Sequence, residues 1–341
     1  MKAMLLKEIQ NLSANSSPLE YCEIPDPVPL ENEILIQVSV CGVCHTELDE
    51  IEGRLPPSHL PIILGHQIVG KVIQAPAESQ FTPGDRVGVA WINQSCGKCS
   101  YCLSGFENLC PDFKATGRDV NGGYAQFTTS VPQFTFLIPD SLSDQQAAPL
   151  LCAGAIGYRS LRLTNLQDGK NLGLTGFGAS AHLVLQLARF QFPNSKIFVF
   201  SRSESERNFA QELGAYWVGA FGDSPPEKLH AIIDTTPAWL PIIEALRVLA
   251  PGGRLVINAI RKETAEQALL TTLDYPTHLW MEKEIKSVAN VTSVDVREFL
   301  RLAASIPIHP EYQEYDLKDA NRALLELKNR KIRGAKILQI E

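Results

Sequence analysis

The sequence predicts an α/β protein of two domains, one built on a doubly wound parallel sheet of six strands and the other rich in β-structure. Three observations lead to this prediction. The chain has 341 residues, about twice the length of an ordinary domain. From about residue 168 onward, apolar runs of strand length alternate with amphipathic runs of helix length, as in a doubly wound sheet. Before that point, short apolar runs are separated by Gly and Pro turns.

The composition is that of a packed globular protein, with 45% hydrophobic and 20% charged residues. The formal net charge of −7 disfavours a polyanionic partner, so we expect no nucleic acid to bind. No stretch approaches the ~20 apolar residues of a membrane-spanning helix, and Lys7 and Glu8 interrupt the first apolar run before it could form a signal-peptide core. We therefore expect no membrane association and a cytoplasmic location, where the eight cysteines stay reduced.

The β-rich domain is predicted for residues 1–150, and its clearest strand covers residues 33–40. Every second residue from Ile34 to Val40 is apolar, whereas Gln37 and Ser39 face the other side, which is the pattern of a half-buried strand. Further strands are predicted at 67–73 and 85–89.

The second domain is predicted for residues 151–290. Its strands are expected at 171–175, 196–201, 216–218, 231–234, 254–259 and 285–290, with helices at 181–190, 203–213 and 240–249 between them. A helix at 296–305 and a strand at 335–340 are expected to return to the first domain, which therefore comprises residues 1–150 and 291–341.

Four cysteines lie within fifteen residues, at Cys96, Cys99, Cys102 and Cys110. Thiols at this spacing can close a tetrahedron around Zn²⁺ and leave no position open, so the pattern predicts a structural zinc site. A zinc ribbon that grips nucleic acid is disfavoured by the acidic charge balance.

A second cysteine motif, Cys41-Gly-Val-Cys44-His45, also fits the attachment sequence of c-type haem, but that chemistry would be expected only after export. His66 and Cys152 would complete a Cys₂His set around Cys44 with one coordination position open. An open position is typical of a catalytic zinc, which acts as a Lewis acid on an alcohol or a carbonyl.

The segment Gly176-Phe-Gly178-Ala-Ser-Ala181 follows a predicted strand and opens a predicted helix, the context of a dinucleotide-binding turn. The next strand ends in Ser201-Arg202, without the acidic residue that would bind the adenosine ribose of NAD. Ser201 carries no charge to repel a 2′-phosphate and Arg202 could bind it, so the sequence favours NADP(H), with NAD(H) possible.

On these motifs the whole chain resembles the zinc-dependent alcohol dehydrogenases of the medium-chain dehydrogenase/reductase family. The resemblance implies a GroES-like catalytic domain and a Rossmann domain. It implies a catalytic zinc on Cys44, His66 and Cys152 and a structural zinc on the four-cysteine loop, two ions per chain. It assigns no role to Cys22 or Cys41.

The resemblance also implies roles for single residues. Thr46 matches the relay residue that passes the alcohol proton to water, and Trp91 matches a position that narrows the alcohol pocket. His45 and Arg333 match positions that contact the cofactor pyrophosphate. The sequence departs from the family at three positions near the zinc, where Gln67 stands for Glu, Glu47 for Asp, and Asp49 for His.

We therefore expect an alcohol dehydrogenase or aldehyde reductase that acts on small primary alcohols, with a homodimer or homotetramer as its assembly. Two alternatives stay open. One is a polyol or amino-alcohol dehydrogenase of the same family, which would place polar groups around Trp91. The other is a zinc- and dinucleotide-binding protein in which the departures at Glu47, Asp49 and Gln67 have weakened catalysis.

Overall fold

The computed structural model describes residues 1–13, 16–329 and 332–341. The chain divides into two compact units. Unit 1 consists of Met1–Ala155, Val291–Ser305 and His309–Glu341, and unit 2 of Ile156–Asn290 and Ile306–Ile308. Because unit 1 includes residues 151–155, Cys152 lies in the same unit as Cys44 and His66.

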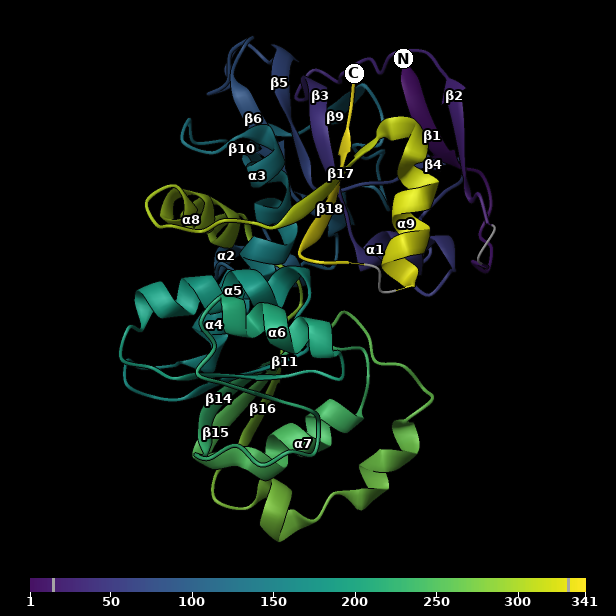
Figure 1. Ribbon diagram of the computed structural model, residues 1–341. Helices are drawn as coiled ribbons and strands as arrows, with labels where there is room; N and C mark the ends of the chain where they lie inside the picture. The colour runs from purple at the N-terminus through teal and green to yellow at the C-terminus, as the bar shows by residue number, and fades with distance from the viewer. Residues whose placement is uncertain (14–15, 330–331) are drawn as a thin grey trace. The chain divides into compact units, whose positions relative to one another are not determined.

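Unit 1 is built around a mainly antiparallel sheet into which the end of the chain inserts (Figure 1), with β17 and β18 as its parallel pair. In the described residues its strand order is β10-β6-β5-β3-β18-β17, and β9 also pairs with β3. The strands are β3 (Ile34–Val43), β5 (Ile68–Gln74), β6 (Arg86–Val89), β9 (Phe127–Ser130), β10 (Thr135–Leu137), β17 (Tyr312–Asp316) and β18 (Ala335–Gln339). Strand β18 pairs with β3 and lies in unit 1.

Smaller elements complete unit 1. A second sheet has the order β2-β1-β4, and a further strand pair joins β7 to β8. Their bounds are β1 (Lys2–Leu6), β2 (Leu19–Glu23), β4 (Ile62–Ile63), β7 (Ile92–Gln94) and β8 (Lys114–Ala115). The helices of this unit are α1 (His45–Ile51), α2 (Ser100–Leu103), α3 (Asp144–Pro149), α8 (Ser293–Ala303) and α9 (Ala320–Lys328). No described helix is long and apolar enough to span a bilayer.

Strand β3 forms because its side chains alternate between the core and the opposite face. Ile34, Ile36 and Val38 are buried, whereas Gln37 is exposed, as the sequence pattern predicts. The buried face belongs to an apolar cluster that also takes in residues from α1 and α9. The strand therefore forms a rigid base from which α1 begins.

Unit 2 is a parallel sheet with the strand order β13-β12-β11-β14-β15-β16 in the described residues. This order is that of a doubly wound dinucleotide fold, so the predicted fold class is confirmed. The strands are β11 (Leu172–Thr175), β12 (Ile197–Phe200), β13 (Trp217–Gly219), β14 (Leu229–Asp234), β15 (Leu249–Ile257) and β16 (Glu284–Ser287). The helices are α4 (Ala155–Thr164), which begins at the unit boundary, α5 (Ala179–Gln191), α6 (Glu204–Glu212) and α7 (Leu240–Val248).

The start of β15 differs from the prediction, which places it at residue 254. The strand begins at Leu249 and runs through Pro251-Gly252, a pair that reads as a turn in the sequence. Gly252 adopts a positive φ of 68°, and the pairing with β14 shifts register in this region. A glycine irregularity inside the strand therefore accounts for the difference.

A single π-helical turn, η3 (Leu150–Gly154), carries Cys152 between α3 and α4. Helix α8 packs against this turn, since a Cβ placed on Gly154 would lie 2.3 Å from Cε1 of Phe299. Phe299 is fully buried. Helix α8, although distant in sequence, therefore holds the turn that carries Cys152.

We expect Phe299→Ala to lower the free energy of unfolding by about 3–5 kcal/mol, because it leaves a cavity beneath η3. The matched control is Val294→Ala on the same helix. Val294 is 43% exposed, so its truncation should change the free energy by no more than about 0.5 kcal/mol. Urea denaturation measures both, and equal losses in the two variants would contradict the packing role given to Phe299.

Candidate active site

The first candidate metal ligand, Cys44, lies at the junction between β3 and α1. Its backbone is extended and caps the helix. The Glu47 carboxylate accepts a hydrogen bond through Oε2 from the backbone N–H of Cys44, at 2.7 Å. An acidic residue at this position satisfies a free N–H and favours the positive end of the helix. The sequence thus fixes the start of α1 and the direction of the Cys44 side chain together.

The structure brings Cys44, His66 and Cys152 to one place, although they are widely separated in sequence. His66 follows β4, and Cys152 lies in η3. The two sulfurs and one imidazole nitrogen all lie within 4.8 Å of one another, and His66 Nε2 is 3.2 Å from Cys152 Sγ. Two thiols and one imidazole are a donor set that suits Zn²⁺ and leaves a fourth position for another ligand.

Glu47 also fixes the orientation of the imidazole. Its Oε1 lies 2.6 Å from His66 Nδ1, and both side chains are fully buried. A carboxylate on Nδ1 turns Nε2 toward the two thiols and makes it a better metal donor. The replacement of Asp by Glu at this position therefore retains a carboxylate partner for the ligand histidine.

The electrostatics of the three residues favour a cation between them. A hydrogen bond from Cys152 and the nearby His66 lower the pKa of Cys44 well below its usual value, although burial opposes this. The hydrogen bond to Cys44 raises the pKa of Cys152 well above its usual value. Burial lowers the pKa of His66, but Glu47 and Cys44 outweigh it and raise that pKa well above the usual value. The raised pKa values of Cys152 and His66 mean that both side chains hold a proton when no metal is bound. A metal ion would replace these protons, since metal ligands must be deprotonated.

The residues of the predicted relay lie in or close to α1. Thr46 Oγ1 is 3.7 Å from Cys44 Sγ and is half-buried. Asp49 is buried and accepts a hydrogen bond from Nε of Arg54 at 2.7 Å. A charge-assisted bond of this kind holds the Asp49 carboxylate in place. Gln67 is also buried, and its side chain packs over Gly42, where a Cβ would lie 2.5 Å from Gln67 Oε1.

Trp91 lies between β6 and β7 and is 8% exposed. Its ring lies 5.1 Å from that of Phe113, and the Arg118 guanidinium lies over it at 5.3 Å from the ring centre. The indole Nε1 is buried and has no hydrogen-bond partner among the described residues. Trp91 thus presents both an aromatic surface and an unused donor.

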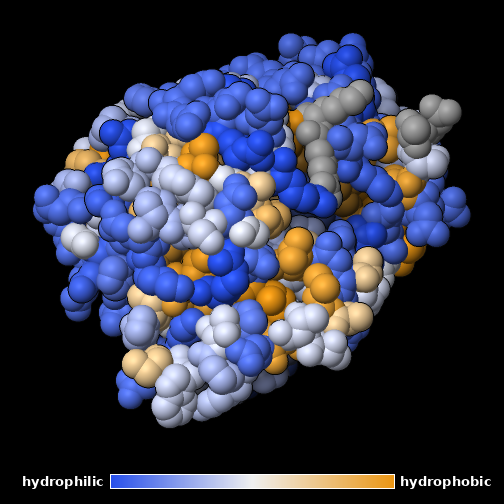
Figure 2. Space-filling view, turned by 60° about the horizontal axis from the view of Figure 1, so that its bottom comes forward, coloured by the Kyte–Doolittle hydropathy of each residue, from blue (hydrophilic) through white to orange (hydrophobic). Residues whose placement is uncertain are grey.

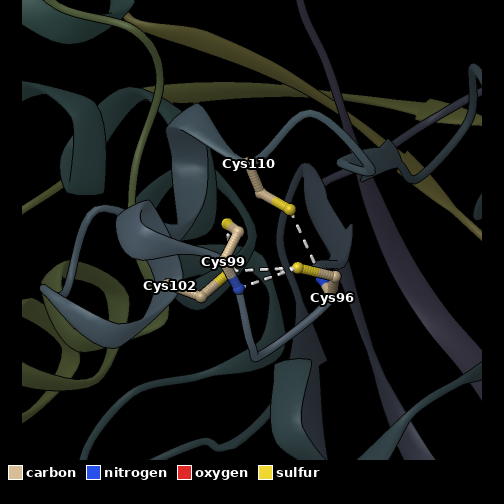
Figure 3. A group of neighbouring side chains, drawn as sticks. All are labelled: Cys96, Cys99, Cys102 and Cys110. Carbon is tan, nitrogen blue, oxygen red and sulfur yellow. Dashed lines mark hydrogen bonds between the residues drawn. The ribbon is translucent and has the colours of Figure 1, made fainter.

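The four-cysteine loop forms a second cluster, with its four sulfurs within 4.8 Å of one another. Figure 3 shows the side chains turned toward a common point. Backbone N–H groups of Lys98 and Cys99 lower the pKa of Cys96 to about 6, which favours its thiolate form. The Sγ atoms of Cys99 and Cys102 lie 3.5 Å apart, and none of the chain's eight cysteines, all of them described, forms a disulfide. Four convergent reduced thiols suit a structural Zn²⁺.

The glycine-rich turn joins β11 to α5 at the point where the strand order of unit 2 reverses. Gly176 has φ of +78°, and a Cβ there would lie 2.8 Å from Thr235 Oγ1, so the turn needs glycine. A Cβ on Gly178, the N-cap of α5, would meet no atom within 4 Å. Ala181 is fully buried. The backbone at Gly178 is therefore open to an approaching phosphate at a helix N-terminus.

The end of β12 contains more charge than its sequence indicates. The Ser201 hydroxyl donates a hydrogen bond to Glu206 of α6. Arg207 Nη1 donates to the carbonyl oxygens of Ser201 and Arg202, at 2.7 and 3.1 Å. Arg202 itself is exposed. Glu206 and Arg207 were not predicted from the sequence, although both lie in the first turn of α6, the helix that follows the strand.

Two further predicted cofactor contacts, His45 and Arg333, lie in unit 1 and are exposed. Arg333 Nη2 is 4.0 Å from Glu311 Oε1. Their role toward a dinucleotide stays a prediction.

A buried ion pair near the end of β11 was also not predicted from the sequence. Asp234 is fully buried and pairs with Lys262. It also accepts a hydrogen bond from Thr175, the last residue of β11, at 2.6 Å. Lys262 in turn donates to Thr236 O at 2.7 Å. These contacts join the carboxyl end of β11, which Gly176 directly follows, to the carboxyl end of β14.

The comparisons with known proteins agree with this geometry. Residues 30–140 match the family model described as the alcohol dehydrogenase GroES-like domain. The chain is 42% identical over 332 residues to a protein of Mycobacterium tuberculosis (strain CDC 1551 / Oshkosh) named probable alcohol dehydrogenase AdhA, covering 96% of this chain and 94% of that protein. It is 31% identical to an alcohol dehydrogenase of Moraxella sp. (strain TAE123), covering 98% of each.

Among solved structures, the alcohol dehydrogenase of the archaeon Aeropyrum pernix has the same fold. The TM-score is 0.86 at 21% identity, and the alignment covers 99% of this chain and 100% of that chain. The fold, the family match and the full-length relatives lead to one conclusion. The chain is an enzyme, an NAD(P)-dependent oxidoreductase of alcohols, and it belongs to the zinc-dependent alcohol dehydrogenases of the medium-chain dehydrogenase/reductase family.

Proposed function

We propose that the enzyme oxidises small primary alcohols, and reduces the corresponding aldehydes, at a zinc ion held by Cys44, His66 and Cys152. The observation that carries this proposal is the convergence of these three donors within 4.8 Å, with Glu47 on the far nitrogen of the histidine. A second zinc, held by the four-cysteine loop, stabilises the fold without taking part in the reaction.

Each part of the chain contributes a separate step. When bound, the catalytic zinc supplies Lewis acidity, which favours loss of the alcohol proton. Thr46, whose hydroxyl lies 3.7 Å from the Cys44 sulfur, accepts that proton and donates its own toward water. Trp91 limits the width of the alcohol that enters. A bound dinucleotide would supply the nicotinamide ring that accepts the hydride. The turn at Gly176 and Gly178 would hold its pyrophosphate, with His45 and Arg333 as further contacts.

The cofactor of this proposal is NADP(H). Arg202 and Arg207 bring two positive charges to the segment that follows β12, where the first turn of α6 also carries the carboxylates of Glu204 and Glu206. The Ser201 hydroxyl donates a hydrogen bond to the Glu206 carboxylate, which directs that carboxylate toward Ser201. A 2′-phosphate then binds Arg202, the exposed member of the group.

A polyol or amino-alcohol substrate is the second candidate, and one observation favours it. The unpartnered Nε1 of Trp91 can donate a hydrogen bond, and Arg118 lies over the same ring. A substrate with a second hydroxyl would satisfy the buried donor, which a simple alcohol leaves unused. A substrate screen separates the two candidates, because only the polar alternative predicts a preference for diols over alcohols of equal length.

We also propose that the enzyme is a homo-oligomer assembled through β16, the edge strand of the unit 2 sheet. All four residues of β16 are exposed, and Ile285, Trp280 and Met281 are exposed hydrophobic side chains on it or just before it. Figure 2 shows hydrophobic side chains at the surface of the face that looks toward the viewer. An edge strand offers free N–H and C=O groups to the same strand of a second copy.

The eight free cysteines support a cytoplasmic location, where thiols stay reduced.

We expect Cys152→Ser to lower the zinc content from about two ions per chain to about one. The rate of alcohol oxidation should also fall. Loss of an outer-shell partner lowers activity by about 10- to 100-fold, and loss of a direct ligand should lower it further. The control is Cys22→Ser, since Cys22 lies in β2 outside both clusters. Elemental analysis and an alcohol assay at 340 nm measure the result, and a Cys152→Ser enzyme with full zinc and activity would refute the site.

We expect Arg202→Ala to lower kcat/KM for NADP⁺ by about ten- to hundredfold, the effect of losing hydrogen bonds to a charged group. The value for NAD⁺ should stay nearly constant, since NAD⁺ has no 2′-phosphate. Glu206→Gln should move the preference further toward NADP⁺. Steady-state kinetics with both cofactors decides the matter, and equal losses with both would exclude 2′-phosphate binding by Arg202.

We expect Ile285→Lys to dissociate the oligomer, because it places a charge at the edge of β16. Val28→Lys is the control, since Val28 is 87% exposed in unit 1. Analytical ultracentrifugation reports the mass of each variant. A wild-type monomer, or an Ile285→Lys oligomer of unchanged mass, would disprove assembly through this strand.

A further inference from the structure

Glu50 is a buried carboxylate for which the proposed mechanism has no use. It lies in α1 and is fully buried. Neither carboxylate oxygen has a hydrogen-bond partner among the described residues. Burying an acidic group without a partner is costly, so such a group in a folded protein calls for an explanation.

The position of Glu50 in α1 relates it to the candidate metal centre. Glu50 follows Glu47 by three residues, so the two side chains lie one above the other on the same face of the helix. Glu47 reaches His66 from that face, at 2.6 Å. The charges of Cys44, His66 and Glu47 all act on the Glu50 carboxylate, and burial raises its pKa well above the usual value.

The positive charges whose fields lower the pKa of Glu50 are those of His66 and Arg118, and neither forms an ion pair with it. His66 is already paired with Glu47. The Arg118 guanidinium is already bound by Asp119, with an Nη2 to Oδ2 distance of 2.6 Å, and it lies over the Trp91 ring. Glu50 therefore lacks the ion pair that normally accompanies a buried carboxylate.

The sequence of the metal centre supplies a reason for a charge at this place. The resemblance implies that an acidic residue usually follows the zinc histidine, whereas this chain has the neutral Gln67. The Gln67 side chain packs over Gly42, two residues before Cys44. Glu47 and Glu50 instead place two buried carboxylates on one face of α1.

We propose that Glu50 is the second acidic group of the catalytic metal centre and takes the electrostatic place that Gln67 leaves neutral. The inference rests on the proposed zinc site at Cys44, His66 and Cys152. Glu50 is a positioning residue: its negative charge strengthens the hold of the ligands on a divalent cation without itself being a ligand. Its own buried charge is compensated when the cation binds.

The test is the rate at which purified full-length enzyme releases zinc to a chelating dye. Glu50→Gln keeps the shape of the side chain and removes its charge. We expect it to speed release from the catalytic site by about 10- to 100-fold, the usual effect of an outer-shell change. Release from the four-cysteine loop should not change, and Cys44→Ser identifies the catalytic phase because it removes that phase.

A second substitution separates charge from structure. Gln67→Glu in the Glu50→Gln background should restore slow release, since it returns the lost charge by another route. A rate equal to wild type in Glu50→Gln would overturn the proposal, as would a fast rate that Gln67→Glu leaves unchanged. The matched control is Glu52→Gln, because Glu52 directly follows α1 but is already paired with Arg54 and Lys328.

The single variant Gln67→Glu provides a further test, which remains valid even if the Glu50→Gln variant does not fold. With Glu50 in place, the added charge should change zinc release by less than about threefold, well below the outer-shell effect. A tenfold slower release of zinc would show that Glu50 does not already supply this second negative charge, and it would overturn the proposal. If wild-type enzyme shows no second zinc phase at all, the proposed zinc site itself has failed, which is a separate outcome.

Discussion

The contacts of the Glu47 carboxylate are the interaction on which the metal centre depends. One oxygen holds the backbone N–H of Cys44 at the start of α1, and the other lies against Nδ1 of His66. A single buried side chain thus fixes two of the three proposed ligands, one on each side of the loop between α1 and β5. The third ligand, Cys152, is positioned independently by η3 and the helix α8 that packs on it.

The fold could be predicted from the sequence because its signals are local. The alternation in residues 33–40 is visible without knowledge of any partner strand, and so is the glycine turn that follows β11. The four-cysteine loop is likewise a short-range pattern, and the structure brings its thiols together. The strand β15 was predicted too short because Pro251-Gly252 has the composition of a turn, and only pairing with β14 makes it part of a strand.

The parts of the site that could not be predicted depend on contacts between distant residues. Glu47, Asp49, Glu50 and Glu52 form an acidic run that would suit an exposed helix face, yet the first three are buried. Asp49 is held by Arg54, and Glu50 has no partner among the described residues. Asp234 ends β14 and Lys262 lies in the segment after β15, so their pairing follows from the sheet topology. Glu206 changes the charge balance at Ser201 only because α6 begins beside the strand end.

The turn that holds Cys152 also sets an order of events during synthesis of the protein. Gly154 in this turn is in contact with Phe299, which the ribosome adds almost 150 residues later. Until α8 has been synthesised and has packed against η3, the turn that carries Cys152 lacks this support. Assembly of the three proposed ligands of the catalytic zinc therefore needs almost the whole chain.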